Sequence, residues 1–238
     1  MIEIRLGPAR VAWSDRHAGV SAPPFDEANI GHHVGDVPAA VDENRRRLAA
    51  RLGIDERGWA WLRQVHGTTV VDGEQAARAP EPVAADAAVT TRPGLPLVVQ
   101  TADCAPLALA NDDAVAVVHA GWPGLLNGII PAAVERLRSA GRGPVRAALG
   151  PCVHPCCYEF GRADLDRIVA VLGDTVESCT SDGAPALDIP AAVRVSLERC
   201  GVDDLHDVDI CTATSPDHFS YRRDGRTGRQ ALVAVLDE

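Results

Sequence analysis

The sequence predicts an α+β fold with mixed β-sheets, formed by a single domain of residues 1–238. Strand-like and helix-like segments follow one another without regular alternation, which is typical of α+β proteins. The 238 residues suffice for a sizeable core, and they contain no internal repeat, low-complexity tract or linker. Hydrophobic residues make up 46% and aromatic residues 4%. Small and β-branched side chains are therefore expected to fill the core.

Short apolar runs predict the strands. Gly7 and Pro8 form a turn between the first two strands, and the Pro- and Ala-rich residues 76–84 predict a loop. The predicted strands cover residues 2–6, 10–14, 59–65, 68–72, 86–91, 95–101, 106–110, 114–119, 145–149, 207–211 and 229–236.

Apolar residues at helical spacing predict the helices. Asp36 and Pro38 mark the start of the first one, because both residue types are favoured at helix N-termini. The predicted helices run from Pro38 to the residue before Gly53, from Gly124 to Ala140, and over residues 162–172 and 190–200.

The charge pattern excludes some partners. The net charge is −10, and only two short arginine clusters interrupt the acidic character, whereas a nucleic-acid-binding protein needs a basic stripe. No apolar run reaches the roughly 18 residues of a membrane helix, and the N-terminus has no apolar signal-peptide region. We expect a cytoplasmic protein whose seven cysteines are reduced.

Three potential metal ligands share one local setting. His66, Cys104 and His119 each lie where a predicted strand gives way to a turn. Side chains at strand ends leave the core and face a cleft, so these three can converge. Two imidazoles and one thiolate are a known ligand set for catalytic zinc, with a fourth position open. The wide spacing of the three residues in the sequence is by itself a weak signal of a metal site. Each residue taken alone is also more often structural than functional.

The same residues allow a metal-free alternative. Cys104 is then a nucleophile and His119 or His66 its base, as in cysteine hydrolases. Asp103 points away from Cys104 if the segment is extended. It is therefore expected to hold a histidine from behind rather than to complete a triad.

A second cysteine-rich segment, GPCVHPCCYEFG, contains Cys152, His154, Cys156 and Cys157. It looks like a metal knot, but adjacent cysteines point apart in an extended chain, and two prolines favour a tight turn. We interpret the segment as a structural loop that walls a pocket.

Arginines form two clusters that suit anionic ligands, because guanidinium groups bind phosphate and carboxylate bidentately. In HFSYRRDGRTGRQ, Arg222 and Arg223 are candidate substrate or phosphate contacts, and one of them is expected to pack inward. Arg226 is expected at an exposed hairpin tip. In DENRRRL, Asn44 and Arg45 are expected on the inner face and the next two arginines in solvent.

Seven ordered blocks carry a family resemblance across nearly the whole chain. They are NIGHHVGD, ENRRRL, RQVHG, TADCAP, HAGWPG, GPCVHPCCYEFG and FSYRRDGRTGRQ. Together they resemble the YfiH/laccase-domain family, once called multicopper polyphenol oxidoreductases. The resemblance implies a cytosolic, single-domain protein with a layered α/β/β/α sandwich, grouped with the catalytic domain of a bacterial cytotoxic deamidase.

The resemblance also implies an activity. The family's zinc ligands fall on His66, Cys104 and His119. The implied reactions are phosphorolysis of adenosine, inosine, guanosine and S-methyl-5′-thioadenosine, with phosphate attacking the ribose C1′, and deamination of adenosine by a zinc-activated water at C6. Arg45 is the implied substrate or phosphate contact, and Asn29 is expected to line the same pocket. We expect a monomer that acts on small molecules.

This chain differs from the family's usual sequence at one position, and its histidines do not suit the family's older name. The family usually has arginine after HAGW, where this chain has Pro123. A multicopper oxidase needs many histidines, often as His-x-His pairs, and the chain has eight histidines and no such pair. Copper-dependent phenol oxidation is therefore the less favoured alternative, although copper can occupy the zinc site.

Overall fold

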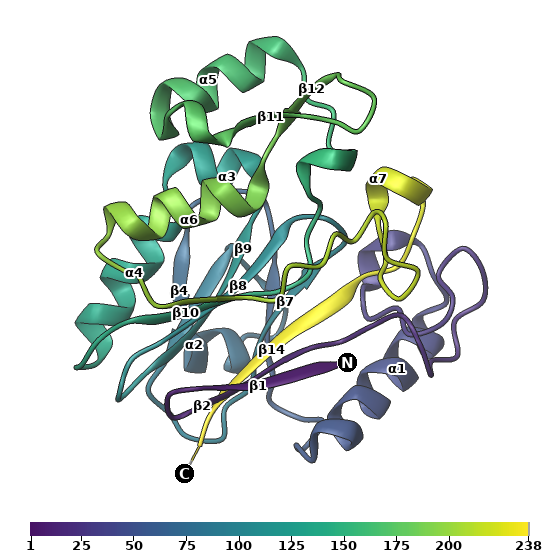
Figure 1. Ribbon diagram of the computed structural model, residues 1–238. Coiled ribbons are helices and arrows are strands. Elements are labelled where there is room, and N and C mark those ends of the chain that lie inside the picture. Colours follow the sequence, from purple (N-terminus) through teal and green to yellow (C-terminus); the bar gives the residue numbers. More distant parts are fainter. Residues whose placement is uncertain (238) are drawn as a thin grey trace.

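The computed structural model describes residues 1–237 and shows two β-sheets stacked between layers of helices (Figure 1). The first sheet has the strand order β1-β2-β14-β7-β3-β5 and the second β13-β10-β8-β9-β6-β4. In the first sheet the strands are β1 (Ile2–Leu6), β2 (Ala9–Trp13), β14 (Gln230–Leu236), β7 (Leu97–Thr101), β3 (Ala60–Arg63) and β5 (Val83–Ala84). In the second they are β13 (Leu205–Asp207), β10 (Arg146–Leu149), β8 (Ala105–Ala110), β9 (Val115–Ala120), β6 (Ala87–Thr90) and β4 (Val70–Asp72).

Both sheets are mixed. In the first sheet β3 pairs in parallel with β7, while β7 pairs antiparallel with β14. In the second sheet β4 and β6 are parallel, while β8 and β9 form an antiparallel hairpin. This arrangement confirms the predicted α+β class with mixed sheets.

Most of the helices cover the two outer faces of the stacked sheets, whereas the short one at Gly73–Arg78 packs against strands of both sheets. They are α1 (Pro38–Leu52), α2 (Gly73–Arg78), α3 (Trp122–Asn127), α4 (Ile129–Ala140), α5 (Arg162–Leu172), α6 (Ile189–Arg199) and α7 (Tyr221–Asp224), with short 3-10 turns at His32–Val34, Pro155–Cys157 and Asp174–Val176. A small hairpin, β11 (Glu177–Cys179) and β12 (Pro185–Leu187), joins the outer layer.

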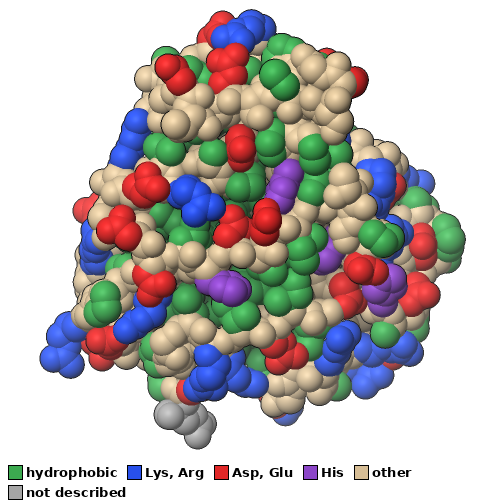
Figure 2. Space-filling view, in the orientation of Figure 1, with side chains coloured by type: hydrophobic (Ala, Val, Ile, Leu, Met, Phe, Trp, Pro, Cys, Tyr) green, Lys and Arg blue, Asp and Glu red, His purple; other side chains and the backbone are tan. Residues whose placement is uncertain are grey.

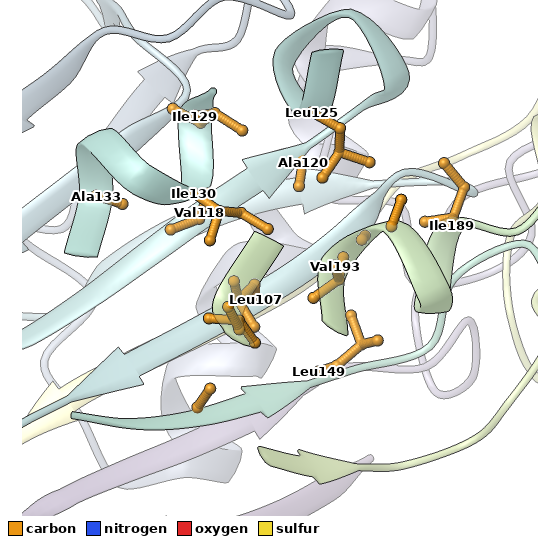
Figure 3. Close-up of a cluster of buried hydrophobic side chains, with 14 of the residues drawn as sticks. Leu107, Val118, Ala120, Leu125, Ile129, Ile130, Ala133, Leu149, Ile189 and Val193 are labelled. Atoms are coloured by element: carbon orange, nitrogen blue, oxygen red, sulfur yellow. The ribbon is translucent and has the colours of Figure 1, made fainter. Parts of the chain in front are cut away.

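The alternation of side chains along each strand produces the layers. On β8, Leu107 and Leu109 belong to the cluster under the helices, whereas Ala108 and Ala110 face the other sheet. Figure 3 shows the first of these clusters, in which α3, α4 and α6 bury side chains against β8, β9 and β10. On the far side, α1 packs on the outer face of the first sheet through residues such as Leu48 and Leu52. The expected α/β/β/α sandwich is confirmed.

Several expected boundaries differ from the structure. The predicted helix 124–140 is two helices, α3 and α4, separated by Gly128, whose φ of 91° cannot continue a helix. The predicted loop 76–84 is wrong in part, because α2 extends to Arg78 and β5 follows. The predicted strand 207–211 lies at 205–207 as β13. The prediction of one domain over residues 1–238 stays a prediction, and its last residue lies outside the described chain.

Candidate metal centre

The structure brings His66, Cys104 and His119 together where the two sheets meet. His66 follows β3, Cys104 lies between β7 and β8, and His119 is on β9. The His66 Nε2 atom lies 3.7 Å from Cys104 Sγ, and the two imidazole rings are 4.7 Å apart at 80°. The ligand atoms of the three residues lie within 4.8 Å of one another.

These donors fit a zinc ion. Bonds of about 2.0–2.1 Å to nitrogen and 2.3 Å to sulfur place tetrahedral donors about 3.3–3.8 Å apart, which the cluster reaches with small rotations of its side chains. His119 is buried, Cys104 is half-buried and His66 is exposed. A fourth coordination position would therefore face the open side, where His66 lies.

Asp86 orients the centre from behind. Its fully buried carboxylate accepts hydrogen bonds from His119 Nδ1 at 2.8 Å and from the backbone amides of His66 at 2.9 Å and Gly67 at 2.7 Å. Burial alone would raise the pKa of Asp86, but these hydrogen bonds outweigh it and lower that pKa. The bond to Nδ1 leaves Nε2 of His119 free to coordinate.

Cys104 and His119 stabilise each other's charged forms. Burial opposes ionisation of the thiol, but the charges and hydrogen bonds of His119 and His66 lower the pKa of Cys104 to about 6. Burial likewise opposes the charge on His119, yet the Cys104 thiolate and Asp86 raise the pKa of His119 to about 9. The thiol is thus prepared either to bind a cation or to act as a nucleophile.

The expectation that Asp103 holds a histidine is wrong. Its φ is 102°, so the segment is not extended. Its two carboxylate oxygens accept hydrogen bonds from Thr212 Oγ1 and from the backbone amide of Arg222, both at 2.6 Å. Asp103 therefore ties together the loops beside Cys104, and the histidine-holding role belongs to Asp86.

Arg45, His33 and Arg229 form a basic group, here called the basic wall, which approaches the centre through Arg229. Arg45 lies 3.6 Å over the ring of Trp61 and donates through Nε to the carbonyl of Ile30 at 2.9 Å. Burial lowers the pKa of Arg45 to about 10, and burial also lowers the pKa of Arg229. His33 lies near both arginines. Burial lowers the pKa of His33, and the positive charges of Arg229 and Arg45 lower it further.

Arg229 links this wall to the centre, because its charge interacts with Cys104 and Asp103. Its backbone amide is held at 2.9 Å by Asn29 Oδ1. The buried Asn29 side chain also donates to Asp36 at 2.9 Å. Asn29 therefore supports the wall through Arg229.

The exposed Arg222 and the half-buried Tyr158 form a second group near Cys104. The guanidinium of Arg222 lies 4.8 Å from the centre of the Tyr158 ring. Burial and then the charge of Cys104 raise the pKa of Tyr158 to about 12, so the hydroxyl keeps its proton at neutral pH.

Arg223 has a different environment from its neighbour. Its guanidinium donates to the carbonyls of Thr212 at 3.1 Å, Ser215 at 2.7 Å and His218 at 2.8 Å, and to Asp224. These bonds use the nitrogens of the guanidinium group, so Arg223 connects the loop of residues 212–218 to α7.

Buried oxygen atoms without partners lie close to the centre. Within the described residues, the Gln100 Oε1 and Thr101 Oγ1 atoms are buried and have no hydrogen-bond partner. Both residues end β7, just before Cys104, and Gln100 Oε1 and the Arg229 side chain both lie next to Gly31. Unpaired buried polar atoms in a native protein call for a ligand or another explanation.

The second cysteine-rich segment departs from the expectation. Cys156 and Cys157 lie in a 3-10 turn instead of an extended chain, so their Sγ atoms do not point apart but lie 3.5 Å from each other. Cys211 approaches Cys156 to 3.9 Å. Cys152 is buried in the hydrophobic core under the helices.

Pro123 lies in the first turn of α3, directly after the strand that carries His119. Proline is accepted there because the first amides of a helix have no intrahelical partner. Pro123 thus fits the local backbone.

Sequence reasoning missed Asp86, Arg229, His33 and Tyr158 as parts of the site. Asp86 left one signal, because it is an isolated acid directly before the buried run of β6. Tyr158 and Arg229 stood inside quoted motifs, and only the tertiary structure distinguishes them from their neighbours.

Fold and site define a two-sheet α+β sandwich protein with a candidate His-Cys-His metal centre between its layers. Residues 10–237 match the family described as multi-copper polyphenol oxidoreductase laccase. The chain belongs to this family, which confirms the family predicted from its motifs.

Known relatives resemble the chain over nearly its full length. A protein of Streptomyces griseus named purine nucleoside phosphorylase is 46% identical, covering 97% of this chain and 96% of the relative. One of Pseudomonas aeruginosa with the same name is 38% identical, covering 97% and 96%.

Solved structures agree with the fold. A crystal structure of a Neisseria meningitidis protein has a TM-score of 0.89 at 31% identity, covering 100% of this chain and 99% of the other. YlmD from Geobacillus stearothermophilus has a TM-score of 0.88 at 31% identity, covering 97% and 93%. Separately, the structure contains, within residues 1–237, no helix with the length and apolar character to cross a membrane.

Proposed function

We propose that this protein is a zinc-dependent purine nucleoside phosphorylase that also deaminates adenosine. The observation that carries the proposal is the meeting of His66, Cys104 and His119, with the half-buried Arg229 close enough for its charge to interact with Cys104. The names of the full-length relatives support the same reaction class. The proposed substrates are adenosine, inosine, guanosine and S-methyl-5′-thioadenosine with phosphate, acted on by a monomer in the cytosol without nucleic-acid or membrane partners.

In this proposal the three residues hold zinc, and Asp86 fixes the tautomer of His119. A bound zinc ion supplies Lewis acidity at its open position. Copper can occupy the same ligands, because the order of divalent-metal affinities favours it. Oxidation of phenols by copper is the less supported alternative, since these residues provide ligands for one ion rather than for several.

In this proposal the basic wall binds phosphate. Arg45 is pre-oriented by Trp61 and the Ile30 carbonyl, which leaves its terminal nitrogens for an anion. Arg229 adds a second positive charge near Cys104. Arg222 offers a third, next to Tyr158, whose hydroxyl stays neutral. Arginine positive charge stabilises the anion as phosphate attacks the ribose C1′.

The test is a turnover assay on zinc-loaded protein. With adenosine and phosphate we expect adenine and ribose 1-phosphate, and with adenosine alone we expect inosine. Folded, metal-loaded protein that forms none of these products would contradict the proposal. Replacing Cys104 by Ser should abolish turnover and the zinc held with His66 and His119, while the same change at the exposed Cys179 should leave both intact.

A matched pair of variants tests the phosphate wall. Arg45→Gln should raise the KM for phosphate about 10- to 100-fold, which corresponds to the roughly 1.5–3 kcal/mol of a charged hydrogen bond. Arg46→Gln changes a neighbouring exposed arginine that pairs with Glu43 and should leave that KM unchanged. Equal changes of the KM for phosphate in the two variants would show that Arg45 does not contact phosphate.

A metal-free cysteine hydrolase remains the second candidate. The pKa of about 6 at Cys104 and the adjacent imidazoles favour a nucleophilic thiolate as well as a metal ligand. The two functions differ in zinc content. Stoichiometric zinc that is lost on His119→Ala would reject the hydrolase, whereas zinc-free protein that cleaves amide substrates would establish it.

A further inference from the structure

A second group of thiols lies apart from the ligands described above. Cys156 and Cys157 come from the 3-10 turn after β10, and Cys211 comes from the segment after β13. The Sγ atoms of Cys156 and Cys157 are 3.5 Å apart, and those of Cys156 and Cys211 are 3.9 Å apart. All three lie within 4.8 Å of one another. We call this group the thiol triad.

From this geometry we propose that the thiol triad is a second metal site, which takes a thiophilic cation such as Cu(I) or Zn(II) through three thiolates. Thiolates around tetrahedral zinc, at bonds of about 2.3 Å, lie about 3.8 Å from one another. The observed spacings of 3.5 and 3.9 Å are already close to that value. A disulfide requires sulfur atoms about 2.05 Å apart, so either pair would have to approach by more than 1 Å.

The backbone around Cys211 also suits a thiolate. The His154 amide donates to Cys211 Sγ at 3.4 Å. Cys211 is itself fixed between a parallel bridge to Cys152 and the turn that follows it. Backbone donors that point at sulfur stabilise its negative charge, as they do around cysteine-bound metals.

One member of the triad, Cys156, lines an acidic hollow on the protein surface. The hollow has a volume of about 370 Å³ and includes Cys156 in its lining, together with His154 and the carboxylates of Asp188, Asp207 and Asp209. Its one arginine, Arg194, pairs with Asp207 at 3.2 Å. Figure 2 shows acidic and histidine side chains gathered near the middle of this face. The net negative charge favours the entry of a cation.

Cadmium titration tests the site, because each Cd(II)–thiolate bond absorbs in the ultraviolet. Metal-free protein is kept in a non-thiol reductant, and the Cys104→Ala variant removes the first centre from the measurement. This variant should take up one equivalent of Cd(II), with about three times the absorbance expected for a single thiolate. Adding Cys211→Ser should abolish that uptake, whereas adding Cys179→Ser should not.

Three results would overturn the proposal. One is a folded Cys104→Ala protein that takes up no Cd(II). A second is uptake that persists when Cys211 is replaced. Circular dichroism and thermal melting establish that each variant is folded, and Cys157→Ala repeats the test at a half-buried position. Mass spectrometry of the untreated protein that finds a Cys156–Cys211 disulfide in reducing buffer would also reject the metal site.

Discussion

At the scale of single residues, Asp86 holds the candidate metal centre together. One buried carboxylate receives the ring of His119 and the amides of the turn that carries His66. The sequence shows this residue only as an acid inside an apolar stretch, so its partners could not be inferred. The positions of His66, Cys104 and His119 were inferable because all three end predicted strands.

Replacing Asp86 by Asn should weaken both the metal site and the fold. The asparagine amide group would place a donor against backbone donors, leaving buried groups unpaired. We expect a loss of about 1–3 kcal/mol in the free energy of unfolding and a loss of about 10- to 100-fold in zinc affinity.

Urea denaturation and competition with a chelator measure the two effects of Asp86→Asn. Glu81→Gln, at an exposed position, is the control and should change neither quantity. Unchanged zinc affinity in the Asp86 variant would show that the carboxylate does not orient His119.

The pKa of Cys104 leads to a pH prediction for the metal-free protein. A pKa of about 6 means that the thiol is mostly ionised above pH 6 and protonated below it. The rate of alkylation by iodoacetamide should therefore rise up to about pH 6 and then level off, whereas an ordinary cysteine gains reactivity up to about pH 8.5.

Mass spectrometry of the Cys104 peptide measures this rate separately from the other six cysteines. His119→Gln should move the midpoint to higher pH, because the imidazolium charge is lost. A rate that keeps rising tenfold per pH unit between pH 7 and pH 8 would contradict the low pKa.

At the scale of elements, the break between α3 and α4 is a helix boundary that the apolar pattern of the sequence does not predict. The apolar spacing across residues 124–140 continues through Gly128, so it predicts one helix. Gly128 nevertheless adopts a φ of 91° and ends α3. The hairpin of β11 and β12 and the short α2 were missed for a related reason. They are too short and too polar to show a period, and neighbouring elements hold them in place.

The conformation of Gly128 predicts how substitutions there behave. A Cβ atom at this position meets no atom within 4 Å, so only the backbone angle opposes a side chain. Gly128→Ala should cost about 1–2 kcal/mol of unfolding free energy, and Gly128→Asn should cost less, because asparagine tolerates the left-handed region. Thermal or urea unfolding measures both, and equal stability of wild type and Gly128→Ala would contradict the strained angle.

At the scale of the whole molecule, small side chains separate the two sheets. Ala88, Ala108, Ala148 and Val117 from the second sheet face the first sheet, with Leu97 and Leu232 opposite. The abundance of alanine and valine in the sequence anticipated a core of this kind. Which two sheets would stack, and in which order their strands would lie, depends on contacts between remote residues and was not visible in local patterns.

A larger residue between the sheets should destabilise the stack. Ala148→Leu inserts extra carbon atoms at a fully buried position and should cost about 1–3 kcal/mol of unfolding free energy. Ala50→Leu, at an exposed position on α1, should change that free energy by less than about 0.5 kcal/mol. Urea unfolding of both variants decides the point, and a neutral Ala148→Leu would indicate a loosely packed interface.

The three candidate ligands span both sheets, since His66 leaves the first, His119 belongs to the second and Cys104 lies in the crossing between them. An ion bound there would connect the two sheets, and it can bind only after the sheets have assembled, because the three ligands are far apart in the unfolded chain. Resistance to heat then depends on the supply of the ion. Above the dissociation constant, each tenfold increase in free zinc adds about 1.4 kcal/mol to folding.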